Sequence, residues 1–139
     1  MKLILENNVY TNIHADFGIE FLTKETLETS AKRELLESAG FKASQDETCL
    51  LLESKTLVCG VEELKSDDLR SATASAIKIL MKHTHERIKI SACGINNIKA
   101  ITEGLILGAY TFERYKSEPK PCEIAEIIIA SEDKQGELA

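Results

Sequence analysis

The most informative part of this sequence is Glu103-Gly-Leu-Ile-Leu-Gly-Ala-Tyr-Thr-Phe-Glu-Arg-Tyr-Lys-Ser117, which lies near its end. Gly104 and Gly108 are four residues apart, so they share one face of a predicted helix. A glycine inside a helix costs about 1 kcal/mol relative to alanine. Two glycines one turn apart therefore predict that the sheet or a neighbouring helix packs closely against this face, with Ile101 and Leu105 in the core.

A second placement of this segment is compatible with the same residues. The two glycines can face solvent and await another domain or subunit, with the aromatic tail from Tyr110 to Tyr115 in the same contact. The two placements predict different effects of substitution at Gly108. In the first, the branched side chain of Gly108→Val overpacks a core contact, whereas in the second Gly108→Ala stabilises an exposed helix by about 1 kcal/mol.

Composition and charge narrow the class of protein. A chain of 139 residues with 43% hydrophobic and 29% charged residues is typical of one globular domain. The net charge of −6 argues against nucleic acid and against an anionic membrane surface as partners, because both require clustered cations. No apolar run approaches the roughly 20 residues of a membrane span, and residues 1–6 have too short an apolar run for a signal peptide.

The cysteines indicate a reducing compartment. Cys49, Cys59, Cys93 and Cys122 form no Cys-x-x-Cys pair, and the first three lie in apolar, strand-like runs. Free cysteine in such runs behaves as a small hydrophobic residue, and nothing indicates the secretion that would favour disulfides. We therefore expect a cytoplasmic protein.

Hydrophobic periodicity predicts three helices, at about residues 27–39, 66–82 and 97–110. The first places Leu27, Ala31, Leu35 and Ala39 on one face. Its expected cap is Thr23 or Thr26, and its expected terminator is Gly40. The second has Ser66 as its expected N-cap, and its apolar face comprises Leu69, Ala72, Thr73, Ala76, Ile77 and Leu80. Asn96 or Asn97 is expected to cap the third.

Short apolar runs predict the strands, at Lys2–Leu5, Val9–Ile13, Asp16–Leu22, Thr48–Glu53, Thr56–Val61, Arg87–Ala92 and Glu123–Ala130. Gly18 breaks the alternation of the third run. The fourth and fifth runs form a candidate hairpin, and Ile127-Ile128-Ile129 is apolar enough for burial on both faces. Alternating strands and helices in the second half favour parallel pairing. The prediction is a three-layer α/β fold with a mixed sheet flanked by helices.

Histidine provides two candidate sites. His83 and His85 would point to different faces of a helix, so they could bind one metal ion only on an extended backbone, and the alternative is a solvated helix end. His14 lies next to Asp16 in sequence, but a catalytic constellation also needs a nucleophile. We interpret His14 as a residue at the end of a strand.

Three further segments have a functional and a structural interpretation. Cys93-Gly-Ile-Asn-Asn97 could hold phosphate at a strand-to-helix turn, but it lacks the glycine pattern of nucleotide-binding loops. Arg114 and Lys116 lie among aromatic residues, as in single-strand binders, or else end a helix. The acidic residues Glu62, Glu63, Asp67 and Asp68 are best interpreted as a solvated surface that includes a helix start.

Several segments resemble the N-terminal domain of the leucyl (cytosol) aminopeptidase family. The opening stretch is similar to that family's E-G-x-x-L-G-x-Y-x-F-x-R-Y-K-S, and Thr56-Leu-Val-Cys-Gly-Val61 to its R-V-x-L-V-G-L-G. Glu62-Glu-Leu-Lys65 resembles the acidic lead into a helix, and Ser71–Leu80 an alanine-rich helix. The order and spacing hold over about residues 15–131.

The resemblance implies a macro-domain-like α/β fold and a parent that is a hexameric leucyl aminopeptidase with two divalent metal ions, zinc or manganese. In that family the metal ligands lie in a C-terminal domain, in motifs such as D-x-x-G and N-T-D-A-E-G-R, and the longer motif does not occur in this sequence. We therefore assign no catalytic, cofactor-binding or metal-binding residue to this chain. We expect residues 1–131 to be an N-terminal structural and oligomerisation domain, and residues 132–139 the start of a linker to an absent catalytic domain, which would be its partner.

The alternative is a macro-domain-like module that binds a nucleotide or another small ligand. Macro domains bind ADP-ribose, but the Asn-Ala-Ala/Asn and Gly-x-Gly patterns that they use for it are absent from this sequence.

Overall fold

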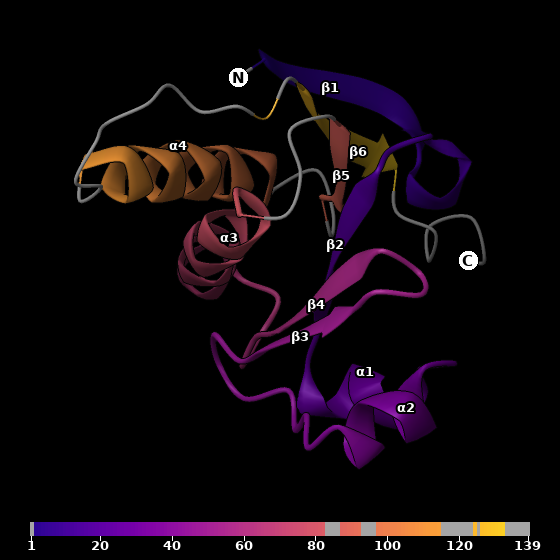
Figure 1. Ribbon diagram of the computed structural model, residues 1–139. Coiled ribbons are helices and arrows are strands. Elements are labelled where there is room, and N and C mark those ends of the chain that lie inside the picture. Colours follow the sequence, from indigo (N-terminus) through magenta and orange to yellow (C-terminus); the bar gives the residue numbers. More distant parts are fainter. Residues whose placement is uncertain (1, 83–86, 93–96, 115–123, 125, 133–139) are drawn as a thin grey trace.

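A single mixed β-sheet organises the computed structural model, which describes residues 2–82, 87–92, 97–114, 124 and 126–132. The strands are β1 (Lys2–Val9), β2 (Phe17–Leu22), β3 (Thr48–Leu51), β4 (Thr56–Gly60), β5 (Arg87–Ser91) and β6 (Glu126–Glu132). Their order across the sheet is β1-β6-β5-β2-β4-β3 (Figure 1). Only β3 and β4 pair antiparallel among these strands, as the predicted hairpin, and the other neighbours are parallel. The predicted mixed sheet is confirmed.

Helices α3 (Ser66–Leu80) and α4 (Ile98–Arg114) cover one face of the sheet (Figure 1). The six residues predicted for the apolar face of α3 are all fully buried. They pack on the side chains of β2 and β4 that point to this face, such as Ile19 and Leu57. Helices α1 (Lys24–Glu28) and α2 (Arg33–Ser38) cover part of the opposite face, where Leu27 and Leu36 pack on Val58.

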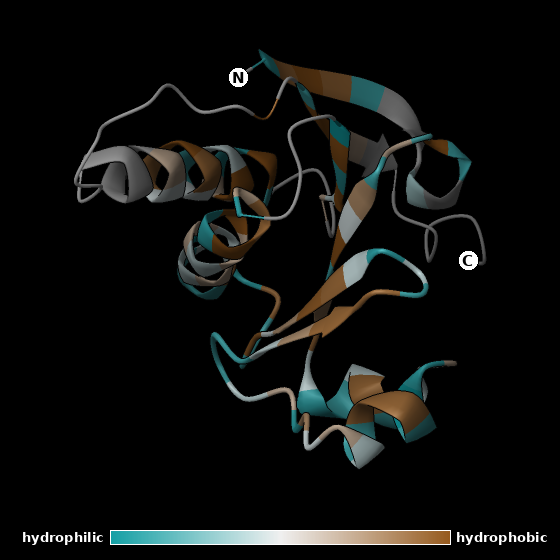
Figure 2. Cartoon of the chain, viewed as in Figure 1, coloured by the Kyte–Doolittle hydropathy of each residue, from teal (hydrophilic) through white to brown (hydrophobic). Residues whose placement is uncertain are grey.

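The strand β6 is buried on both faces, as its isoleucine run predicts. Ile127 and Ile129 belong to the large core beneath α3 and α4. Ile128 and Ala130 point to the other face and pack against Ile13. Apolar residues predominate along β4, whereas β5 alternates polar and apolar residues (Figure 2).

The predicted helix over residues 27–39 is wrong, because the chain turns between α1 and α2. Leu35 is 51% exposed, while its neighbour Leu36 is buried. The turn forms because the hydroxyl of Ser30 accepts a hydrogen bond from the Lys32 N–H at 3.1 Å, and such local bonds compete with helix. Thr23 does cap α1 with a capping box. Gly40, with φ of 87°, ends α2 as predicted.

Two other predicted boundaries differ from the structure. The predicted strand Val9–Ile13 is wrong, since Tyr10–Asn12 form a short 3-10 helix, η1. Ser66 is the first residue of α3 rather than its cap; Lys65 takes the cap position and makes no side-chain capping bond. No helix among the described residues is both long and apolar enough to cross a membrane.

Candidate functional site

The two glycines of α4 lie against the backbone of α3. A Cβ atom on Gly104 would be 2.6 Å from the carbonyl oxygen of Arg70, and one on Gly108 would be 2.5 Å from that of Ala74. Both glycines are buried. The predicted close packing is therefore confirmed, its partner is a helix rather than the sheet, and the placement facing solvent is wrong. Ile101 and Leu105 are in the core, as predicted.

The described candidates from the sequence have structural roles. The Asp16 carboxylate accepts the Arg87 backbone N–H at 3.0 Å, and the His14 carbonyl accepts the Arg87 guanidinium at 3.2 Å, so this segment closes the start of β5. In the acidic run, Asp67 pairs with Arg70, and the Asp68 carboxylate accepts the Glu63 N–H at 3.1 Å.

Other residues with a functional interpretation in the sequence lie outside the residues that the structure describes. These are His83, His85, Cys93, Cys122, Lys116, residues 94–96 and the side chains of residues 110–114. Cys49 and Cys59 are free, and burial raises the pKa of both thiols. No group of three or more His, Cys, Asp or Glu residues could hold a metal ion within the described residues.

A large pocket opens at the carboxyl ends of β2 and β4, with a volume of about 710 Å³. It is lined by residues 23–26, 43–45 and 62–64. Gln45 joins its walls, because its side chain accepts the Glu62 N–H at 2.8 Å and donates to the Asp68 carbonyl at 2.9 Å. Ligands of open α/β sheets commonly bind outside the carboxyl ends of strands.

A second cavity lies on the sheet face opposite α3 and α4, and we call it the sheet trough. It has a volume of about 360 Å³ and is lined by Tyr10, Ala15, Asp16, Phe17, Gly18, Glu20, Lys32, Glu53, Ser54, Lys55, Thr56 and Lys89. The trough separates two apolar clusters, one beneath α1 and α2 and one around Ile13. Its floor is a row across three strands, because Gly18 is in register with both Thr56 and Lys89.

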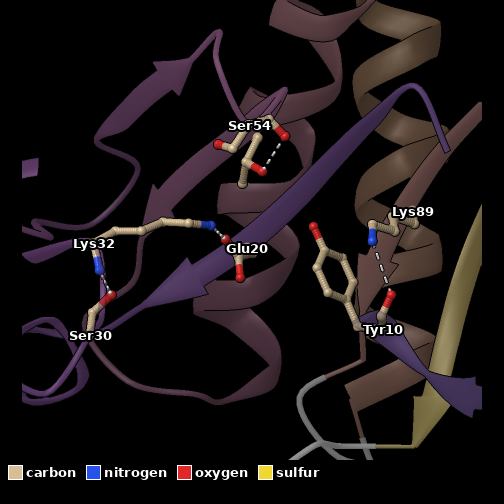
Figure 3. Close-up of polar contacts among 7 residues, drawn as sticks. Tyr10, Glu20, Ser30, Lys32, Ser54 and Lys89 are labelled. Atoms are coloured by element: carbon tan, nitrogen blue, oxygen red, sulfur yellow. Dashed lines mark hydrogen bonds and ion pairs between the residues drawn. The ribbon is translucent and has the colours of Figure 1, made fainter. Parts of the chain in front are cut away.

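Cations and a phenol converge in the sheet trough (Figure 3). The Lys89 ammonium donates to the Tyr10 carbonyl at 3.1 Å and lies 4.3 Å from the centre of the Tyr10 ring. Lys32 and Glu20 form an ion pair. Burial lowers the pKa of Lys89. Burial, together with the charge of Glu20, raises the pKa of the Tyr10 phenol, which therefore stays protonated.

Sequence reasoning missed both cavities. The trough combines residues from four distant segments, which carry no common motif. Its one signal in the sequence is Gly18, which interrupts the alternation of β2. The large pocket had no comparable signal in the sequence. In the structure, Ala43 and Asp46 near this pocket have positive φ angles of 58° and 65°.

Comparisons with known proteins agree on one family. A family model described as the N-terminal domain of the cytosol aminopeptidase family matches residues 23–119. Two probable cytosol aminopeptidases match 98% of this chain. The one from Wolinella succinogenes is 26% identical over the matched part, and the one from Campylobacter jejuni is 30% identical. The chain spans only 29% of the length of each of these relatives.

A solved structure shows the same fold. The crystal structure of a cytosol aminopeptidase from Coxiella burnetii matches 97% of this chain with a TM-score of 0.51, over 29% of its own chain. The sequence identity in this match is 11%, so it concerns the fold alone.

Proposed function

Because this chain belongs to the cytosol aminopeptidase family, as a form of its N-terminal domain, we propose that it is the non-catalytic domain of a longer, metal-dependent aminopeptidase. The observation that carries the proposal is the family match over residues 23–119, combined with a chain that spans 29% of its relatives. The longer protein would release N-terminal residues, leucine among them, from peptides.

The roles of the described carboxylates support this division of labour. Two-metal hydrolysis needs several carboxylates that converge on paired ions. The carboxylates of Asp16, Glu47 and Asp68 instead accept backbone N–H groups, so they stabilise loops and element ends. We propose that the ligands for two zinc or manganese ions lie in the remaining part of the longer protein.

Assembly is the role that we propose for the domain itself, in a cytoplasmic homo-oligomer, a hexamer by resemblance. Helix α4 supports this role, since its inner face is fixed on α3 while Ile106 and Leu107 on its outer face are 54% and 53% exposed. Apolar residues on a rigid helix suit a contact with the catalytic domain or another subunit.

Deleting the domain tests this role. We expect the longer protein without residues 1–131 to bind its metal ions but to have a smaller assembly mass by light scattering after size exclusion. An intact assembly mass in the deleted protein would contradict the proposal. The full-length protein, measured at the same concentration, is the control.

A second candidate function is a small-ligand module like the macro domains. The observation in its favour is the 710 Å³ pocket at the carboxyl ends of β2 and β4. Isothermal titration calorimetry with ADP-ribose decides between the two functions. Micromolar binding would favour the module, and no heat beyond dilution would remove it.

A further inference from the structure

The hydroxyl of Tyr10 is buried and has no hydrogen-bond partner among the described residues. A buried polar group without a partner is destabilising, so each such group in a folded protein needs an explanation. Packing alone does not explain it, because phenylalanine would fill the same site without the oxygen. A ligand that bonds the hydroxyl would explain it.

Gly18 makes room for this hydroxyl. A Cβ atom on Gly18 would lie 1.9 Å from the Tyr10 hydroxyl oxygen and 3.0 Å from the ring carbon that bears it. The space left by the missing side chain is therefore occupied mainly by the oxygen. Two residues on different elements, a glycine in β2 and a tyrosine in η1, together place a hydroxyl in the sheet trough.

The Lys89 side chain reaches the same point. Its Cε atom would lie 3.5 Å from a Cβ atom on Gly18. The ammonium donates one hydrogen bond, to the Tyr10 carbonyl at 3.1 Å, and it carries three N–H groups in all. The Tyr10 hydroxyl and the Lys89 side chain thus both lie beside Gly18 in the wall of the trough, and each has a hydrogen that it can donate to an acceptor there.

We propose that the sheet trough binds a small carboxylate, which accepts hydrogen bonds from the Tyr10 hydroxyl and the Lys89 ammonium. A volume of 360 Å³ is at the lower end of the range for ligand pockets and suits a molecule of the size of a free acid or an amino acid. Lys32 adds a second cation near the site, partly neutralised by Glu20. The carboxylate belongs either to a simple acid or to a zwitterion whose ammonium group faces Glu20 or Glu53.

The proposal is tested by NMR on the 139-residue chain with ¹³C-labelled lysine side chains. We expect sodium acetate to shift the Lys89 signal saturably, with a dissociation constant of about 1 mM or weaker for so small a ligand. Sodium chloride at equal ionic strength should not shift the Lys89 signal saturably. Glycine is the zwitterion arm: binding tighter than acetate assigns an amino acid, and equal binding assigns a simple carboxylate. Both results support the proposal.

Two variants locate the site. Tyr10→Phe removes one oxygen and should weaken acetate binding about tenfold, as expected for a hydrogen bond to a charged group. Lys99→Met, at an exposed position on α4, is the matched control and should bind like the unsubstituted chain. Unchanged binding by the Tyr10→Phe variant, or equal acetate shifts at Lys89 and Lys99, would overturn the proposal. So would the absence of a saturable shift.

Discussion

Gly108 on α4 lies against Ile77 on α3, so closely that a Cβ atom on the glycine would be 2.3 Å from Cγ2 of the isoleucine. The same Cβ atom would lie 2.5 Å from the carbonyl oxygen of Ala74, so the two helices pack backbone against backbone at this point. The contact fixes α4 on α3.

Substituting Gly108 by alanine should destabilise the domain. Overpacking costs about 1–3 kcal/mol, whereas the gain in helix propensity is about 1 kcal/mol, and the carbonyl of Ala74 cannot move aside as a flexible side chain would. We expect the thermal midpoint to fall by several degrees, and further for Gly108→Val. Scanning calorimetry measures it.

Glu103→Gln on the same helix is the control. It removes an exposed ion pair with Arg70, and exposed ion pairs contribute little. A Gly108→Ala variant that is more stable than the unsubstituted chain would show that the close contact with α3 does not exist.

Much of this layer could be predicted from sequence, because helix periodicity and the glycine pair are local patterns. Every apolar position predicted for α3 is buried. The break between α1 and α2 could not be predicted from sequence, because Leu27, Leu35 and Ala39 fit a helical period. The hydrogen bond to the hydroxyl of Ser30 favours the turn instead. The sheet trough could not be predicted either, because only the pairing of β2 with β4 and β5 brings its residues together.

Gly18 and Tyr10 should be energetically coupled. Gly18→Ala places a methyl group on the Tyr10 hydroxyl and should therefore destabilise the domain by displacing the ring from Lys89. Tyr10→Phe alone should be neutral or stabilising, because it removes a buried hydroxyl without a described partner.

A double-mutant cycle by urea denaturation measures this coupling. In the Tyr10→Phe background, we expect Gly18→Ala to cost less by about 0.5–3 kcal/mol, the range for residues in contact. Additive effects of the two substitutions would contradict the arrangement of the trough.

The stability of the domain should decrease at alkaline pH, in part through Cys59. Burial raises the pKa of this thiol in the folded protein, whereas the unfolded thiol has an ordinary pKa of about 8.5. Above that pH the unfolded state loses a proton that the folded state keeps, so the free energy of unfolding falls as pH rises.

Denaturation midpoints between pH 7 and 10.5 measure this slope. Tyr10, whose pKa is also raised, contributes with the same sign above about pH 10. Cys59→Ala keeps Tyr10 and lacks the thiol, so we expect a shallower decrease in this variant. Equal slopes in the two proteins would refute the role of Cys59.

We propose that this domain serves an aminopeptidase without performing its chemistry. The measurement that tests it most directly is the hydrolysis of leucine p-nitroanilide by the purified 139-residue chain, with manganese or zinc added, beside the longer protein. We predict turnover by the longer protein only. Metal-dependent turnover by the purified chain alone would contradict the account.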